Sequence, residues 1–265
     1  MDEIIIKPSA DDIRQANAEF DSENEILIIE EALQELFGQY PRNTEPAQAL
    51  LKVTALNTLY STQIPLYRKN TPTILDVAEH IVTLGIDSNL ERGDEGLVNR
   101  LAKTEVPRKR TFYYYSFATK YCSWHNPNAY PIFDSRVYTY LCHLVNCSCL
   151  ERFRQNDMWD YPKFKKVIEE FQVRNQLGGF TFKEIDKFLY LQGAMLIGQK
   201  TKKETEPSAT EAVETDPIFV PVPGEPGEME VSIENYPTPE DFENSRKKFT
   251  ASAGWVFKAA DEEKV

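Results

Sequence analysis

The sequence lacks any long apolar run. A membrane-spanning helix needs about 20 consecutive apolar residues, whereas the longest apolar-leaning stretch, Phe188 to Gly198, is short and is interrupted by Gln192. The first residues, Met1 to Lys7, also lack the basic region and the cleavage site of a secretory signal peptide. We therefore expect a cytoplasmic chain that makes no contact with a membrane.

Cysteine and histidine are scarce as well. Four cysteines in 265 residues do not suggest the disulfide framework of a small secreted domain. Cys147 and Cys149 are too close together for a usual zinc knuckle, and Cys122 with His125 and His143 fits no familiar set of metal ligands. We expect buried or half-buried free thiols, no metal and no other cofactor.

The charge is unevenly distributed. The net charge of −12 argues at first sight against binding to nucleic acid, but residues 201–265 alone contribute −8 of it. Between Leu97 and Arg136 the sign reverses, and this segment carries a net charge of +5. Contact with phosphate requires such a local basic patch. The alternative is that these side chains only form a solvated helix face.

The composition changes near Lys200. Residues 201–234 are rich in Glu, Pro, Thr, Ser and Val, and such a stretch cannot bury enough apolar surface to offset the entropy of ordering it. We expect a folded domain at residues 1–200 and an acidic, Pro/Glu-rich, mostly disordered tail at 201–265. Within the tail, aromatic and basic residues at 244–258 suggest a short segment that docks on a protein partner; the alternative is an unselected disordered end.

Helix start and stop signals recur throughout the first 200 residues. Pro46 is suited to a first helical turn, and Thr181 with Glu184 forms the pattern of a capping box. Gly38, Gly85 and the pair at 178–179 are expected to end helices. The predicted helices begin near Asp21 or Ser22, Pro46, Pro72, Asp94, Asp160 and Thr181.

Strand signals are nearly absent. No segment alternates apolar and polar residues over a useful length, and no Asn-Gly or Asp-Gly hairpin occurs before the tail. With short connections rich in Pro, Gly and Asn, eight or nine helices would form one compact all-α domain.

Residues 111–137 are the densest group of unusual residues. A helix that carries Lys120 is expected to break at Asn126–Asn128. The chain then continues in an extended piece at 130–133, and Asp134 begins the next helix. This arrangement places a lysine and a carboxylate on two elements joined by a short connection, where both could line one cleft.

These residues resemble those of the helix-hairpin-helix DNA glycosylases, the superfamily of endonuclease III and the 8-oxoguanine DNA glycosylases. Residues 116–120 fall where that family has its hairpin and its lysine, and residues 131–134 fall where it has an essential aspartate. Segments 56–62 and 184–189 add to the resemblance, which covers roughly residues 40–195. It implies a multi-helix glycosylase-like fold that excises an oxidised or otherwise modified base from DNA, with or without AP-lyase activity.

The resemblance also implies roles for individual residues. Lys120 would be the nucleophile, and Asp134 would stabilise positive charge at C1′ and assist proton transfer. Tyr121, Trp124 and His125 would line the pocket for the extruded base. The DNA backbone would be held by Arg108, Lys109, Arg110, Ser116 and Arg136.

Each role has an alternative. Lys120 could be a surface lysine, Asp134 a helix cap, and the aromatic residues and His125 part of the core. Residues 116–118 contain no glycine, whereas the family's hairpin has a Gly-x-Gly. The alternative function is therefore a non-catalytic DNA- or protein-binding module that recruits a partner through its acidic tail. A third hypothesis is a regulatory or phage-related protein whose tail imitates DNA.

Overall fold

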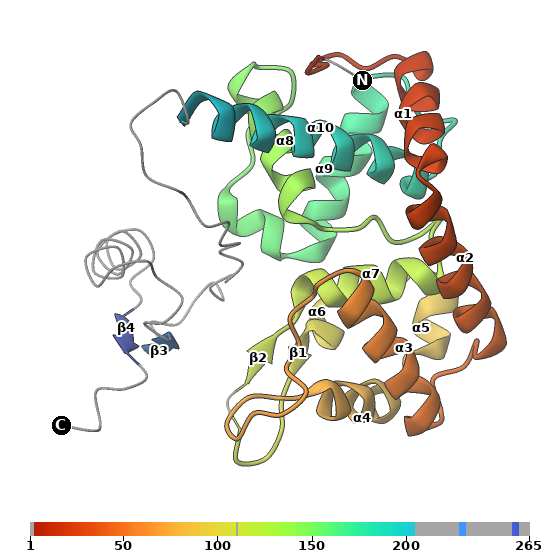
Figure 1. Cartoon of the computed structure of the whole chain (residues 1–265), viewed down its shortest axis with the longest axis vertical. Helices are drawn as coiled ribbons and strands as arrows, with labels where there is room; N and C mark the ends of the chain where they lie inside the picture. The colour runs from red at the N-terminus through yellow and green to blue at the C-terminus, as the bar shows by residue number, and fades with distance from the viewer. Residues whose placement is uncertain (1–2, 110, 205–227, 232–255, 260–265) are drawn as a thin grey trace. The chain divides into compact units, whose positions relative to one another are not determined.

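The computed structural model shown in Figure 1 describes residues 3–109, 111–204, 228–231 and 256–259. The contacts divide the chain into two compact units, Met1–Glu206 and Pro207–Val265. Among its described residues the first unit holds ten α-helices and one pair of two-residue strands. The predicted all-α class and the compact multi-helix domain are confirmed.

The helices have the following bounds. In chain order they are α1 (Ala10–Ser22), α2 (Asn24–Gln39), α3 (Pro46–Leu59), α4 (Ile74–Leu84), α5 (Asp87–Arg92), α6 (Gly96–Ala102), α7 (Tyr115–His125), α8 (Ser135–Asn146), α9 (Tyr161–Arg174) and α10 (Phe182–Glu204). A short 3₁₀ helix at Gln155–Trp159 precedes α9.

The helices pack in two groups that α2 connects (Figure 1). In one group α10 packs against α8 and α1, and Phe171 of α9 stacks on Phe188 of α10. In the other group α3 packs against α4 and α7, and α7 packs against α6. Helix α2 contacts α1, α3 and α7. Lys120 on α7 and Asp134 before α8 therefore belong to different groups.

Several helix ends follow from local signals in the sequence. Helix α3 begins at Pro46, as predicted. Thr73 and Asp76 form a reciprocal capping box at the start of α4, two residues beyond the predicted start, and Gly85 ends this helix with a φ of 60°. The predicted capping box of Thr181 and Glu184 is present before α10.

Other helix boundaries differ from the prediction. Helices α1 and α5 were not predicted, and the expected cap at Asp21 or Ser22 lies inside α1, so that α2 begins at Asn24. Helix α9 ends at Arg174 and not at the glycine pair 178–179. Gln176 adopts a left-handed φ of 59°, which lets Leu177 turn back into the core and donate its N–H to the carbonyl of Gln172.

A small hairpin corrects the expectation of no strands before the tail. Strands β1 (Lys103–Thr104) and β2 (Phe112–Tyr113) pair antiparallel and connect α6 to α7. Two-residue strands are too short to show the alternation by which a strand is recognised in a sequence.

The second unit is described only at β3 (Glu228–Val231) and β4 (Val256–Ala259), which pair in parallel. The rest of residues 207–265, including 244–255 of the predicted docking segment, lies outside the described residues. Across the part of the chain that is described, no helix combines the length and the apolarity needed to cross a membrane.

Candidate active site

The candidate site residues of helix α7 lie on two neighbouring faces of the helix. Residues four apart in a helix lie above one another, so Ser116, Lys120 and Trp124 share one face. Tyr121 and His125 share the neighbouring face, which packs against Phe37 of α2. Tyr121, Trp124 and His125 were predicted to line one pocket; the rings of all three contact Phe37, but only Trp124 also belongs to the face of Lys120.

Lys120 is buried, with an exposed fraction of only 3%. Its ammonium donates hydrogen bonds to Oγ of Ser116 at 2.7 Å and to Oδ2 of Asp134 at 3.1 Å. It also lies 5.8 Å from the ring centroid of Tyr60, within the range of a cation–π contact. The alternative of an exposed surface lysine is therefore wrong.

Asp134 serves as a helix cap and as an ion-pair partner at the same time. Its Oδ1 accepts the N–H of Arg136 at 2.9 Å at the start of α8, while its Oδ2 faces Lys120. Burial opposes ionisation of this carboxyl, but the Lys120 charge and the Arg136 N–H together hold its pKa below the usual value. The two interpretations made from the sequence are thus compatible.

The segment before Asp134 is fixed from two sides. Thr119 on α7 accepts the N–H of Phe133 at 3.1 Å, and Tyr161 donates its hydroxyl to the carbonyl of Pro131 at 2.9 Å. The ring of Phe133 lies 4.6 Å from that of Trp159, measured between centroids. A buried and hydrogen-bonded connection of this kind holds the lysine and the carboxylate in a defined relative position.

A second carboxyl, Asp186 on α10, belongs to the same cluster. Burial, with the Asp134 charge, raises its pKa to about 7, and the Lys120 charge partly opposes these two effects. In the sequence, Asp186 was distinguished only as part of the resembling segment 184–189. The signal that could have identified it is an acidic residue two positions after the capping-box glutamate, on the side of the helix that also bears Lys183 and Tyr190.

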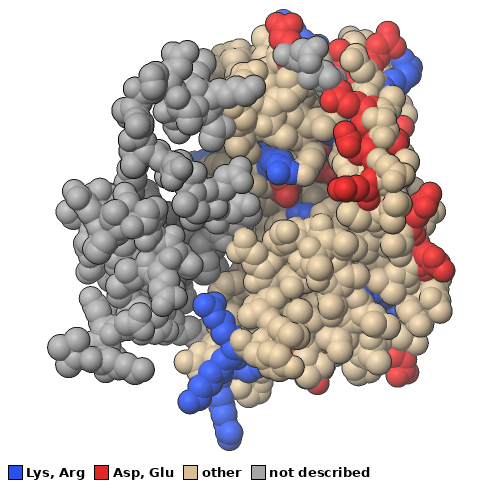
Figure 2. Space-filling model, viewed as in Figure 1, with Lys and Arg blue, Asp and Glu red and all other residues tan. Residues whose placement is uncertain are grey.

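Trp124 and Tyr60 form an aromatic wall next to Lys120. The Tyr60 hydroxyl accepts a hydrogen bond from Trp124, and burial raises the pKa of Tyr60. The ammonium of Lys183 lies 4.7 Å from the Trp124 ring centroid and 3.0 Å from Oε2 of Glu30. Figure 2 shows basic and acidic side chains next to one another in the middle of one face of the first unit.

Tyr121 and His125 do not line an open pocket, which corrects the prediction for both. Tyr121 is fully buried and donates its hydroxyl to Oδ1 of Asn43 at 2.6 Å. His125 packs on Phe37, and its Nε2 lies 3.3 Å from the ammonium of the fully buried Lys52. Burial, with the Lys52 charge, lowers the pKa of His125 to about 3. Both residues hold α7 against α2 and α3.

The predicted hairpin at 116–118 is also wrong, because these residues lie in the first turn of α7. Ser116 accepts a hydrogen bond from Lys120. The first N–H groups of a helix have no partner within the helix, so a phosphate would meet the start of α7 and not a glycine-containing loop. The connection between α6 and α7 is instead the β1–β2 hairpin.

The predicted phosphate-binding residues fall in two places. The guanidinium of Arg136 lies 4.4 Å from the ring centroid of Tyr190, beside the candidate site. Arg108 is exposed with a left-handed φ of 68°, and Lys109 pairs with Asp76 at the start of α4. Arg110 lies outside the described residues.

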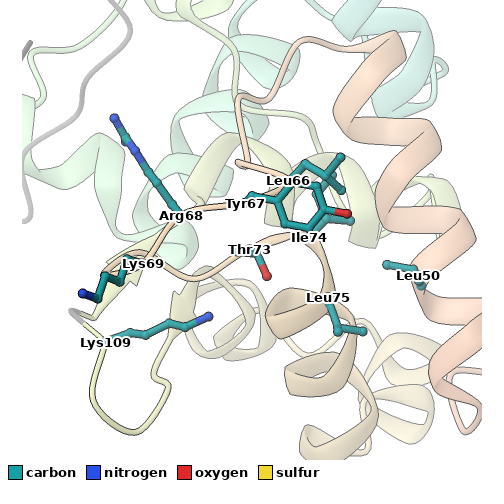
Figure 3. A pocket seen from close by; sticks show the side chains of 9 residues that line it. All are labelled: Leu50, Leu66, Tyr67, Arg68, Lys69, Thr73, Ile74, Leu75 and Lys109. Atoms are coloured by element: carbon teal, nitrogen blue, oxygen red, sulfur yellow. The ribbon is translucent and has the colours of Figure 1, made fainter.

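A pocket of about 690 Å³ lies at the second basic place (Figure 3). In Figure 3 the side chains of Arg68, Lys69 and Lys109 border one side, and apolar side chains from α3, α4 and the segment between them form the other. Neither Lys120 nor Asp134 lines it. The lining residues are Leu50, Leu66, Tyr67, Arg68, Lys69, Thr73, Ile74, Leu75 and Lys109.

No cluster of three His, Cys, Asp or Glu side chains suited to a metal ion occurs among the described residues. Cys122 is buried, and burial raises the pKa of its thiol. Sγ of Cys147 lies 3.7 Å from Nε2 of His143, one helical turn before it.

The N-terminal half of the chain matches known sequences. Residues 12–129 match a protein-family model described as the HI_0787_N N-terminal domain. Over 128 residues the chain is 40% identical to an uncharacterized protein of Haemophilus influenzae, and this alignment covers 48% of the chain and 60% of that protein. The chain thus spans less than two thirds of that relative's length. No solved structure matches the chain.

The family match includes only part of the candidate site. Residues 12–129 contain α7 with Lys120 and Trp124, and they end before Asp134 and before α10 with Asp186. The family match therefore bears on the part of the site that carries the lysine and does not extend to the two carboxylates.

Proposed function

We propose that this chain is a DNA glycosylase that removes an oxidised or otherwise modified base through Lys120 and Asp134. The observation that carries the proposal is the 3.1 Å contact between Nζ of Lys120 and Oδ2 of Asp134, made by a lysine that is only 3% exposed. Ionisable groups held together out of water are typical of functional sites. The resemblance to helix-hairpin-helix glycosylases rests on the same two residues and supports the same assignment.

The chemistry of an N-glycosidic bond matches these two side chains. When the bond breaks, the electron pair leaves with the base and C1′ becomes positively charged, which a nearby carboxylate such as Asp134 stabilises. The amine of Lys120 forms a bond to C1′, and opening of the sugar ring gives a Schiff base that permits strand cleavage. This reaction needs no cofactor.

The surroundings of the pair suit an extruded base. Such a base must leave the stack, and it binds between aromatic walls, which Tyr60 and Trp124 can supply beside Lys120. The guanidinium of Arg136, which lies over the Tyr190 ring beside the candidate site, would hold a flanking phosphate. A cytoplasmic location, where DNA is accessible in a bacterial cell, is part of the proposal.

Borohydride trapping tests the proposal directly. Purified full-length chain is incubated with duplexes that contain 8-oxoguanine, uracil or a hypermodified cytosine, and covalent adducts and free base are measured. The wild type and a control, Lys163→Ala on the exposed side of α9, are expected to form an adduct, whereas Lys120→Ala forms none. Release of base without an adduct would support the glycosylase activity but would overturn the role of Lys120 as nucleophile. Neither base release nor adduct on any substrate would overturn the proposal.

The second candidate function is a binding module on the same scaffold. It is favoured by the pocket of Figure 3, where Leu66 is 62% and Tyr67 is 87% exposed next to Arg68 and Lys69. Exposed apolar residues beside cations are typical of an interaction site for an anionic partner. The acidic tail, residues 201–265, would recruit a further protein.

Gel shifts distinguish the module from the enzyme. A module should bind DNA with an affinity that falls steeply between low and moderate salt, should lose affinity in Tyr67→Ser, and should be unaffected by Lys120→Ala. That pattern, without base release from any substrate, would favour the module. Absence of DNA binding even at low salt would exclude DNA as the ligand of the module and leave a protein as its partner.

A further inference from the structure

Helix α10 carries a row of residues that meets the start of α8. Lys183, Asp186, Tyr190 and Gly193 are three or four residues apart and therefore share one face of the helix. Tyr190 lies beneath the guanidinium of Arg136, and Gly193 touches the Arg136 backbone. Asp186, one turn before Tyr190, therefore lies on the face of α10 that is turned toward Asp134 and Lys120, with both of which it interacts electrostatically.

The ionic groups around Asp186 come from every neighbouring element. Glu30 is on α2, Tyr60 follows α3, Lys120 is on α7, Asp134 caps α8, and Lys183 is on α10 itself. The two lysines each have another carboxylate as a partner: Lys120 pairs with Asp134 at 3.1 Å and Lys183 pairs with Glu30 at 3.0 Å.

Among the described residues, one carboxylate of this cluster makes no ion pair. Lys187 pairs with Asp21 and lies 3.7 Å from Glu30. By this count each of the three lysines has another carboxylate as its partner and the guanidinium of Arg136 lies over Tyr190, while Asp186 forms no ion pair with any described residue. A half-buried carboxylate without a cation of its own is stabilised by binding a proton. The pKa of about 7 that burial and Asp134 produce at Asp186 agrees with this count.

We propose that Asp186 accepts the proton that the Lys120 ammonium must lose before the amine can attack C1′. This inference rests on the proposed glycosylase function and adds a proton-transfer residue to it. Asp134 is a poor acceptor for that proton, because Lys120 and the Arg136 N–H stabilise its ionised form. A group that titrates near neutral pH is best suited to take up and return a proton. Asp134 would therefore stabilise the positive charge at C1′, and Asp186 would accept the proton from Lys120.

Over one base excision, the proton that Lys120 loses ends on the departing base. Because Lys120 and Asp186 form no ion pair, the proton moves from Nζ of Lys120 through one bridging water to the Asp186 carboxylate, and the freed electron pair forms the bond from nitrogen to C1′. The bond from C1′ to the base breaks, and its electron pair leaves with the base. The protonated Asp186 then gives its proton to the departing base, directly or through one water, and returns to the carboxylate.

Single-turnover base release measured between pH 5 and pH 9 tests this role. For the wild type the rate should rise with pH through about 7, where Asp186 ionises, and then level off. Asp186→Asn should lower the rate at pH 7 by about 100-fold and should lose the inflection near 7. Asp186→Glu should restore both in part. Glu169→Gln, a charge change on the exposed side of α9, should resemble the wild type.

A second substrate separates the two proposals. On a duplex with a preformed abasic site no base has to leave, and borohydride trapping reports only attack by the Lys120 amine. At pH 9, where free amine is more abundant, Asp186→Asn should be trapped nearly as well as the wild type, while Lys120→Ala is not trapped. Trapping of Asp186→Asn with the wild-type pH profile would overturn the role of Asp186 alone. No trapping of the wild type on any duplex would overturn the glycosylase itself.

Discussion

Gly193 of α10 lies directly against the backbone of Arg136 at the first turn of α8. A β-carbon at position 193 would be 2.1 Å from the Arg136 carbonyl oxygen and 2.5 Å from its carbonyl carbon. Contacts this short do not occur between nonbonded atoms, so only glycine permits the observed approach. The approach matters for the candidate site because Asp134 is two residues before Arg136, and Asp186 is two turns before Gly193.

Gly193→Ala should therefore separate the two helices. The clash is with backbone, which cannot rotate away as a side chain can, so the free energy of unfolding should fall by about 2–3 kcal/mol. The matched control is Gly198→Ala on the same helix, where a β-carbon has nothing within 4 Å. This change should be neutral or stabilise by about 0.5–1 kcal/mol. Urea denaturation of both variants checks the prediction, which equal stabilities would contradict.

The Lys120–Asp134 pair should show strong energetic coupling. Lys120→Met leaves a carboxylate whose side chain is only 23% exposed without its cation, which should cost about 2 kcal/mol. Adding Asp134→Asn should recover at least about 1 kcal/mol of this loss, because asparagine is neutral and still caps α8. The control pair Arg14–Asp11, with side chains 65% and 92% exposed, should show no measurable coupling. Double-mutant cycles by urea denaturation provide the comparison.

Local signals were sufficient for much of the fold. The capping boxes before α4 and α10 and the proline at the start of α3 depend on residues within one turn. The proximity of Lys120 and Asp134 could be predicted for a similar reason, since only one short extended connection separates their helices. Features that a few neighbouring residues determine were therefore readable from the sequence.

The remaining features depend on distant packing. Asp186 is 66 residues after Lys120 in the chain, and the two interact electrostatically because α10 crosses α8 closely at Gly193. No local pattern encodes that crossing. The mistaken assignment of Tyr121 and His125 to an open pocket has the same cause, because Phe37 of α2 and Lys52 of α3 pack against both residues.

The stability of the chain should fall in mild acid because of His125. Its pKa is about 3 in the folded protein, with burial as the main cause, whereas an unfolded histidine titrates near 6.5. Between these values the unfolded chain binds a proton that the folded chain does not, so stability is lost as the pH falls below about 6.5. His125→Gln keeps an acceptor for Lys52 and should be less sensitive to acid by about 1 kcal/mol between pH 7 and pH 5. Urea denaturation at both pH values gives the difference, and parallel curves for the two proteins would contradict it.

Asp186 should affect stability in the opposite direction. Its pKa of about 7 in the folded protein is raised above the ordinary value of 3.8 for an aspartate, so the folded chain binds the extra proton. The stabilising contribution is therefore complete below about pH 4 and is lost as the pH rises through about 7. At pH 8 the ionised carboxylate faces Asp134, and Asp186→Asn should then be more stable than the wild type by about 1 kcal/mol, a value reduced for contact with water. At pH 5 the wild-type carboxyl is protonated and the two proteins should differ little. The same stability difference at pH 5 and pH 8 would show that Asp186 does not titrate in this range, and it would remove the basis for proton transfer from Lys120.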